Sequence, residues 1–241
     1  MLHIWHFKCR SAPVFRRVTM YTSTQPPATP EELRLLIKKV SHKDQFLNLV
    51  KVRFRSSAAD RKLITNAYHW NAELFANITR LSGGSYMDGH LVPVAVLLLE
   101  YWLVLDAEMI AAALSHDSLE DFPGVVSRQL ITKQQTPEVS RLVFGVTKPP
   151  LKGRSKNSVA YSHAIISRVE AYGRDCVFLK CDADRLHNML TLWGAPVKKR
   201  WKLWETEQYF LPLAKRFNLP TAELSMAIAE QRNRLHIDDT N

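Results

Sequence analysis

The chemically active side chains of this chain gather at the end of an alanine-rich segment, AALSHDSLEDFPG (residues 112–124), where His116 stands beside Asp117. Glu120 and Asp121 follow three and four residues after that aspartate. If the segment is helical, these groups line adjacent strips of one helix end, because residues four apart lie one turn apart. Carboxylates beside an apolar surface need a cation or hydrogen-bond donors, and a divalent metal ion supplies that compensation directly. A solvated acidic helix end is the alternative, since a His-Asp pair alone is weakly informative.

Two further segments offer partners for such a site. In ADRLHNMLTL (residues 183–192), Asp184 and Asn188 lie one turn apart among apolar residues, so an acid and an amide on one face need a partner. The glycine-rich segment RLSGGSYMDGH (residues 80–90) predicts a loop that ends on His90, ahead of a helix whose apolar face must pack into the core. A mixed set of imidazoles and carboxylates suits Mn²⁺, Fe²⁺ or Zn²⁺ better than Ca²⁺. Positions left open on the ion are where water and a phosphate oxygen bind in metal-assisted hydrolysis.

Helices must position these residues. The chain has only 8 glycines, and apolar residues recur three and four apart along most of its 241 residues, so the sequence predicts an all-α fold. Proline and acids at 30–32 predict a first helical turn, and Asp106 is a predicted N-cap. We expect a bundle of about ten helices, with boundaries uncertain by a few residues. They are expected near 30–41, 44–54, 59–79, 91–104, 107–117, 136–146, 157–172, 175–192, 197–217 and 221–235.

Residues 30–241 are expected to form a single domain, because no internal repeat or linker divides them. Residues 1–29 form a basic leader followed by a Pro/Thr-rich linker, expected to be a disordered tail or an extension upstream of a start at Met20. The leader lacks a continuous apolar stretch and a small-residue cleavage site, which argues against a secretory signal. The longest apolar run, residues 94–105, contains Glu100 and is too short to span a bilayer, so no membrane partner is expected.

The net charge of +10 favours an anionic ligand. Two basic runs, residues 148–156 and 198–202, are either solvated faces or parts of an anion site. Neither lies beside a helix-turn-helix, zinc-finger or aromatic RNA-binding pattern, so charge alone does not predict a nucleic-acid partner. The odd number of cysteines, 3, argues against a disulfide framework and suits a reducing cytoplasm.

At these motifs the chain resembles the HD-domain metallophosphohydrolases, and within them the hydrolase domain of the RelA/SpoT homologues. The resemblance rests on four segments in the family's order, which together span about 140 residues and of which the last two are the more specific. They are RLSGGSYMDGH (80–90), AALSHDSLED (112–121), ADRLHNMLTL (183–192) and ETEQYFLPLAKRFNL (205–219). Because the chain ends soon after the fourth segment, it resembles the small, stand-alone alarmone hydrolases.

The resemblance implies an HD-type hydrolase domain that removes the 3′-pyrophosphate of the alarmones ppGpp and pppGpp, giving GDP or GTP and pyrophosphate. It implies that Mn²⁺ is held by His90, His116, Asp117 and Asp184. Glu120 and Asp121 would position and activate the water. Arg80 would lie against the base, and Asn188 and Thr191 would contact the base or the sugar. The candidates to hold the leaving pyrophosphate would be Lys148, Lys152 and Arg154. The partner is thus a small nucleotide; the oligomeric state does not follow from the sequence.

The chain departs from the family pattern near the base and phosphate positions. The loop at 80–90 is one residue longer than usual, Leu81 replaces a basic residue, and Leu190 stands where arginine is common. These departures leave open an adenine-based alarmone or another nucleotide such as NADPH. A nucleotide sensor or antitoxin-like module is a further alternative, against which the complete Glu120–Asp121 pair argues, since a pure binder needs no water-activating carboxylates.

Two groups of residues inside or near these motifs are expected to have ordinary structural roles. His187 lies three residues after Asp184, which points it slightly off that face, so it is interpreted as a helix histidine. The tryptophans, among them Trp193 and Trp201, are interpreted as core or helix-packing residues.

Overall fold

The computed structural model describes residues 26–80 and 83–237, and every regular element within them is a helix. The α-helices are α1 (Pro30–Val40), α2 (Lys43–Arg53), α3 (Ala58–Leu74), α4 (Val92–Val96), α5 (Ala107–Ser115), α6 (Ser118–Asp121), α7 (Arg128–Gln134), α8 (Pro137–Val146), α9 (Val159–Ala171), α10 (Arg174–Val177), α11 (Arg185–Leu190), α12 (Pro196–Glu205), α13 (Leu211–Arg216) and α14 (Ala222–Arg234). Four π-helical segments join them, η1 (Met87–Leu91), η2 (Leu97–Tyr101), η3 (Phe178–Asp184) and η4 (Thr206–Phe210). The predicted all-α class is confirmed.

Three of the long helices expected from the sequence are composites of α-helical and π-helical turns. Residues 87–101 run through η1, α4 and η2, residues 174–190 through α10, η3 and α11, and residues 196–216 through α12, η4 and α13. Such π turns insert an extra residue per turn and frequently occur at functional sites. Here η1 carries His90 and η3 ends on Asp184.

Helix ends follow the capping signals of the sequence. Thr29 forms a capping box with Glu32 at the start of α1, and the Asp106 carboxylate accepts hydrogen bonds from two backbone N–H groups at the start of α5. Residues 1–25 of the expected leader and linker lie outside the described residues. The last linker residues are held in place, since the Ala28 N–H donates to the Tyr101 hydroxyl at 2.9 Å.

Two helices differ from the expectation. Helix α3 ends at Leu74, about a turn earlier than expected, because the chain turns toward an antiparallel bridge between Thr79 and Ser85 that closes the glycine loop. Helix α7 was not expected. It has seven residues with a single buried side chain, Ile131, too short a pattern for a clear apolar periodicity.

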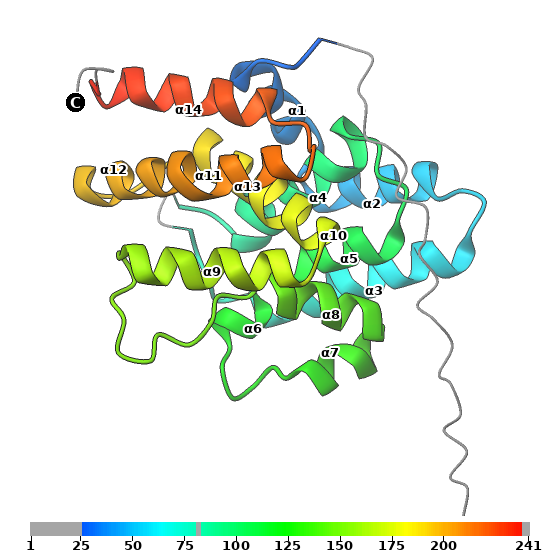
Figure 1. Ribbon diagram of the computed structural model, residues 1–241. Helices are drawn as coiled ribbons and strands as arrows, with labels where there is room; N and C mark the ends of the chain where they lie inside the picture. The colour runs from blue at the N-terminus through cyan, green and yellow to red at the C-terminus, as the bar shows by residue number, and fades with distance from the viewer. Residues whose placement is uncertain (1–25, 81–82, 238–241) are drawn as a thin grey trace, which may run out of the picture.

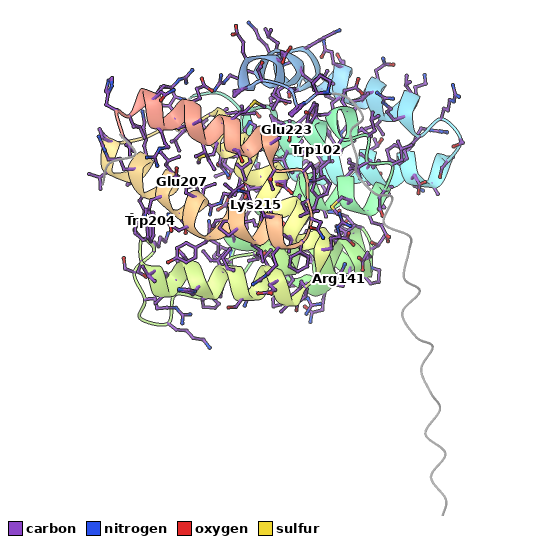
Figure 2. All side chains as sticks on the ribbon, turned by 45° about the horizontal axis from the view of Figure 1, so that its top comes forward. Trp102, Arg141, Trp204, Glu207, Lys215 and Glu223 are labelled. Carbon is purple, nitrogen blue, oxygen red and sulfur yellow. The ribbon has the colours of Figure 1, made fainter. Side chains whose placement is uncertain are left out.

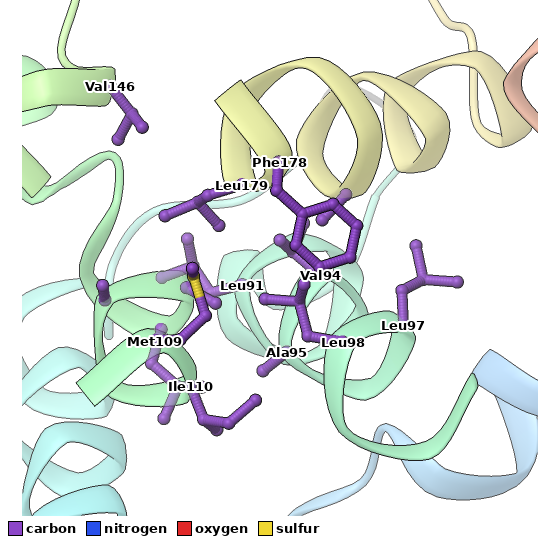
Figure 3. Close-up of a cluster of buried hydrophobic side chains, with 14 of the residues drawn as sticks. Leu91, Val94, Ala95, Leu97, Leu98, Met109, Ile110, Val146, Phe178 and Leu179 are labelled. Atoms are coloured by element: carbon purple, nitrogen blue, oxygen red, sulfur yellow. The ribbon is translucent and has the colours of Figure 1, made fainter. Parts of the chain in front are cut away.

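The core lies between three groups of helices that Figure 1 shows as stacked rows, with α1 and α14 at the top, α11 to α13 in the middle, and α9 and α8 below. Figure 3 shows its centre, where Phe178 reaches from η3 toward Val94 and Leu98. These three side chains are at most 1% exposed, and Met109 and Ile110 of α5 pack into the same cluster. The helices that bear His90, His116 and Asp184 therefore share one core.

Polar contacts fasten the outer helices to this core. Figure 2 shows Glu207 over η4, where its carboxylate accepts a hydrogen bond of 3.0 Å from Arg232 of α14. Glu223, at the other end of α14 and near Trp102 in the same view, accepts a 2.6 Å hydrogen bond from the Tyr101 hydroxyl. Among the described helices, none is both long enough and apolar enough to cross a bilayer.

Candidate metal centre and adjoining cavity

His90 lies inside the first turn of a helix and not at the end of a loop, which corrects the sequence-based expectation. The helical backbone begins right after Tyr86, because Met87 and Leu91 are both buried and anchor η1 to the core. Gly89 lies in this turn, and a Cβ on it would meet the Arg80 side chain at 3.1 Å. The absence of a side chain at Gly89 thus lets Arg80 lie close to the turn that carries His90.

His116 and Asp117 form the break between two helices, so the single helix end expected from the sequence is wrong in its backbone. Helix α5 ends at Ser115 and α6 begins at Ser118, whose hydroxyl donates to the Ser115 carbonyl at 2.7 Å. The His116 Nδ1 lies 2.7 Å from the Ala113 carbonyl oxygen, which accepts a hydrogen bond and so places the proton on Nδ1. Nε2 is left with its lone pair for a metal ion.

Asp184 projects from the end of η3 and is held by its own helix. Its Oδ2 lies 2.8 Å from the Lys180 ammonium, and its Oδ1 accepts a 2.5 Å hydrogen bond from the Asn188 amide. Lys180 and Asp184 are both buried. Burial opposes ionisation of the Asp184 carboxyl, but the charge of the neighbouring Lys180 ammonium holds its pKa well below the ordinary range.

Four donor atoms converge between these elements. His90 Nε2 lies 3.2 Å from His116 Nε2, 3.3 Å from Asp117 Oδ2 and 3.4 Å from Asp184 Oδ1. Ligand atoms with bonds of about 2.0–2.2 Å to one ion are spaced by about this distance. His90, His116 and Asp184 alone form a buried group whose ligand atoms all lie within 4.8 Å of one another. The chemistry and spacing of this set fit a divalent metal ion.

His187 touches the metal centre, contrary to the expectation of an ordinary helix histidine. Its Nδ1 lies 2.8 Å from His90 Nδ1, and its side chain is buried. Burial and the neighbouring His90 hold the pKa of His187 well below its usual value, so its ring is neutral and its Nδ1 can accept a hydrogen bond from the His90 Nδ1–H group. This hydrogen bond leaves His90 Nε2 free for a ligand bond. The two residues are 97 positions apart, and no sequence spacing signals such a contact.

The two carboxylates expected to activate water lie beside the donor set. Lys148 and Glu120 form an ion pair, with 2.5 Å between Nζ and Oε1. The Glu120 Oε2 is buried and has no hydrogen-bond partner among the described residues. Burial, followed by the charges of Asp117 and Glu120, raises the pKa of Asp121 to about 6. The Tyr86 hydroxyl donates to Asp117 Oδ2 at 2.8 Å and steadies that ligand.

A cavity of about 550 Å³ opens next to this centre. Four of the six substrate-contact residues expected from the sequence line it, namely Arg80, Lys148, Asn188 and Thr191, together with Glu120. The Arg80 guanidinium lies 3.4 Å from the Thr191 hydroxyl and 5.7 Å from the centre of the Tyr86 ring. The folded chain therefore brings these distant positions to one wall beside the metal centre.

Two expectations about the surroundings of the cavity are wrong. Lys152 and Arg154 do not line it; the Arg154 guanidinium donates to the Pro150 carbonyl of its own loop at 3.2 Å. Trp193 and Trp201 both line it. Trp193 is 58% exposed and so is not a core residue, whereas Trp201 packs against Trp204 of the same helix, which agrees with a helix-packing role. The segment 191–195 between α11 and α12 carries Trp193 outward, away from the apolar face that the sequence pattern suggested.

The family model described as "HD domain" matches residues 67–219 of this chain. That range runs from the second half of α3 to just past α13. It therefore contains every residue of the metal centre and its cavity.

Three curated relatives match over about two thirds of the chain. The chain is 35% identical over 158 residues to "Guanosine-3′,5′-bis(diphosphate) 3′-pyrophosphohydrolase" of Aquifex aeolicus, covering 65% of this chain and 22% of that protein. It is 37% identical over 163 residues to "Bifunctional (p)ppGpp synthase/hydrolase SpoT" of Escherichia coli, covering 66% and 22%. It is 33% identical over 159 residues to "GTP pyrophosphokinase rsh" of Brucella ovis, covering 65% and 20%. The chain spans about a fifth of the length of these relatives.

The structure is also similar to a solved structure described as "A metazoan ortholog of SpoT hydrolyzes ppGpp and plays a role in starvation responses". The TM-score is 0.58, and the likeness covers 74% of this chain and 96% of the other. At 19% identity, this likeness concerns the fold.

Proposed function

Because the chain belongs to the HD domain family, we propose that it is a metal-dependent hydrolase that removes the 3′-pyrophosphate of guanosine alarmones, ppGpp and pppGpp. The products are GDP or GTP and pyrophosphate. The observation that carries the proposal is the convergence of His90, His116 and Asp184 on one point beside a cavity lined by Arg80 and four lysines. The relatives from Aquifex aeolicus and Escherichia coli, named as a guanosine-3′,5′-bis(diphosphate) 3′-pyrophosphohydrolase and a (p)ppGpp synthase/hydrolase, support the same substrate.

The metal ion proposed for this site is Mn²⁺, held by His90, His116, Asp117 and Asp184. Nitrogen and carboxylate ligands in equal number suit Mn²⁺, and another borderline divalent ion would fit the same donors. When bound, such an ion lowers the pKa of water and draws charge from the phosphoryl oxygens under attack. The protein prepares its own donors for this task through the Ala113 carbonyl, which fixes the tautomer of His116.

The proton of the attacking water passes to the pair formed by Glu120 and Asp121. Lys148 fixes Glu120 through Oε1, so that Oε2 remains available to accept the proton. The raised pKa of Asp121, about 6, brings this carboxyl close to neutral pH, where a general base works well. The two carboxylates therefore orient the water and remove its proton without any further group.

The nucleotide occupies the adjoining cavity. Arg80 lies against the base, where its planar guanidinium can stack on the ring. Asn188 and Thr191 contact the base or the sugar from α11 and the residue that follows it. Lys148 reaches the phosphate end, next to Glu120. The enzyme is a cytoplasmic protein in this proposal, consistent with free and buried Cys176 and Cys181.

The test is a hydrolysis assay with ppGpp and saturating Mn²⁺, in which release of pyrophosphate and GDP is measured by ion-exchange chromatography. We expect turnover that a chelator abolishes and that Asp184→Ala reduces by several orders of magnitude. Asp44→Ala, an exposed acid on α2, is the matched control and should keep full activity. Absence of pyrophosphate release from both ppGpp and pppGpp would overturn the proposal.

A second candidate is the hydrolysis of another phosphorylated nucleotide, such as an adenine alarmone or NADPH. It is favoured by Trp193 and Trp201, whose rings line the cavity and can stack on an additional aromatic group. A substrate panel under the same conditions separates the two functions. Turnover of ppGpp and pppGpp supports the first, whereas turnover of an adenine alarmone or of NADPH in their place supports the second. Tight nucleotide binding with no turnover on the whole panel would instead indicate a sensor or antitoxin-like module.

A further inference from the structure

The cavity beside the metal centre carries more positive than negative charge. Its cationic lining residues are Arg80, Lys148, Lys156, Lys198 and Lys202, and its acidic ones are Glu120 and Glu205. These side chains come from the loops before η1 and after α8 and from helices α6 and α12, so residues far apart in the sequence build one electrostatic wall. An excess of positive charge around a cavity favours an anionic ligand.

Neither acid neutralises the cavity. Glu120 is paired with Lys148. Glu205 is turned toward Arg185 behind the wall, at 2.9 Å, and also accepts a 2.8 Å hydrogen bond from the Ser162 hydroxyl. By contrast, the side-chain nitrogens of the three remaining lysines have no hydrogen-bond or ion-pair partner within the part of the chain that the structure describes. These are Lys156, Lys198 and Lys202.

Lys202 is the most enclosed of the three, since it is half-buried whereas Lys156 and Lys198 are exposed. The positive charge of Arg185, followed by burial and by Lys148, lowers the pKa of Lys202 to about 7, although Glu205 acts in the opposite direction. Repulsion between cations thus disfavours the ammonium form in the empty cavity. An anion placed between Lys202 and Lys148 would relieve this repulsion.

We propose that Lys202, together with Lys148 and Lys156, forms a binding site for a pyrophosphate group, the one that leaves in the hydrolysis proposed above. The inference rests on that proposed function for the source of the anion, whereas the site itself rests on the cavity and its unpaired cations. Lys148 contacts Glu120 of the water-activating pair, so a group held by Lys148 lies beside the point of attack. Lysines act as point charges that can follow a pyrophosphate as it departs.

The site depends on two elements that meet only in the folded chain. Helix α12 provides Lys202, and the loop between α8 and α9 provides Lys148 and Lys156. The Tyr161 hydroxyl donates to the Pro149 carbonyl at 2.9 Å and ties this loop to α9. The basic runs at 148–156 and 198–202 therefore contribute to one pocket, and only some of their members face it.

The first experiment measures inorganic pyrophosphate binding to the metal-free protein by isothermal titration calorimetry, in EDTA and without turnover. We expect Lys202→Met to weaken binding by at least about tenfold, the size expected for the loss of one charge-assisted contact. Lys202→Arg should restore most of the affinity. Lys199→Met is the matched control, since it removes the same charge from the same helix at a position that does not line the cavity.

Equal weakening by Lys199→Met and Lys202→Met would overturn the proposal, because the effect would then be one of net charge. Unchanged binding in Lys202→Met, with a circular dichroism spectrum and melting temperature like those of the unsubstituted protein, would also overturn it. Because no reaction occurs in this experiment, its result is independent of whether ppGpp is a substrate. If the hydrolysis assay fails but pyrophosphate binding still depends on Lys202, only the proposed function is refuted.

The second experiment separates the leaving pyrophosphate from the 5′-diphosphate of the nucleotide. Inhibition by pyrophosphate and by GDP is measured in the holoenzyme for Lys202→Met and Lys199→Met. We expect Lys202→Met to raise the inhibition constant of pyrophosphate at least about tenfold and to leave that of GDP close to the value of the control. The opposite pattern would assign these lysines to the 5′-diphosphate and would overturn the assignment.

Discussion

The ion pair between Arg185 and Glu205 predicts a strong and asymmetric effect on stability. Arg185 is 1% exposed and Glu205 is 5% exposed, and their side chains meet at 2.9 Å between Nη1 and Oε2. The pair joins α11, which follows Asp184, to α12, which carries Lys202. Loss of one partner leaves a buried charge without compensation, and this typically costs about 3–5 kcal/mol.

We expect Glu205→Met to be the more damaging of the two single substitutions. It leaves the guanidinium with a 3.4 Å contact to the Thr206 hydroxyl and the face of Phe210, neither of which carries a negative charge. The Arg185 Nε already has no hydrogen-bond partner among the described residues. Arg185→Met leaves a carboxylate that keeps its hydrogen bond from Ser162 and the attraction of Lys202, so its cost should be smaller.

Thermal and urea unfolding followed by circular dichroism measure these effects. A loss of about 3–5 kcal/mol in a chain of this size lowers the melting temperature by about 6–20 °C. The double variant Arg185→Met with Glu205→Met should recover to within about 1–2 kcal/mol of the unsubstituted protein, since apolar side chains can replace a buried pair. The control Glu170→Met breaks an exposed pair with Arg216 and should cost less than about 1 kcal/mol.

The pH dependence provides an independent check on this pair. Burial alone would raise the pKa of Glu205, but the charges of Arg185 and Lys202 hold it below the ordinary value of about 4.3. A carboxyl with a lowered folded-state pKa stabilises the protein above its unfolded pKa, and this contribution is lost as the pH falls through the lowered value. Glu205→Met should therefore lose less stability than the unsubstituted protein on acidification below about pH 4.3. A double variant that is as unstable as the sum of the single variants would refute the reasoning.

Three further predictions concern other buried contacts. Asp182→Leu should raise the free energy of unfolding by about 1–3 kcal/mol at pH 7 in urea titrations, because neither carboxylate oxygen has a hydrogen-bond partner among the described residues; unchanged or lower stability would contradict this. Gly145→Ala should lower the melting temperature through a loss of about 1–3 kcal/mol, since its Cβ would lie 2.5 Å from the Cys176 sulfur; an unchanged value would show that α8 and α10 separate easily. Lys180→Met should weaken Mn²⁺ binding about 10–100-fold in calorimetric titrations, because its ammonium orients Asp184; an unaltered affinity would exclude that role.

Much of the fold follows from local signals in the sequence. Apolar residues at helical spacing predicted the all-α class, and the caps at Thr29 and Asp106 lie where proline and acidic residues indicated helix starts. Short or irregular elements escaped this approach. Helix α7 has one buried residue, and the break after Ser115 lies where the sequence was expected to continue as a helix. Periodicity reports which residues are apolar, and it carries little information on where the backbone hydrogen bonds change partner.

The types of the candidate ligands could also be read from the sequence, because buried imidazoles and carboxylates are costly without a partner. His90, His116 and Asp184 were expected to meet on these grounds and by resemblance to a family, and the folded chain brings their donor atoms within 4.8 Å. The environment of each ligand was not predictable in the same way. The contact of His187 with His90 joins residues 97 positions apart through the packing of η1 against α11.

The sequence by itself thus determined the helical class, most helix boundaries and the kinds of atom available to a metal ion, since these depend on residue type and on spacing within one or two turns. Only the tertiary structure decided which lysines face the cavity, that Trp193 lines it, and that Arg185 and Glu205 share one buried site. The physical reason is that burial and charge pairing depend on the distances between separate helices, which are fixed by the packing of the whole core and not by any local pattern.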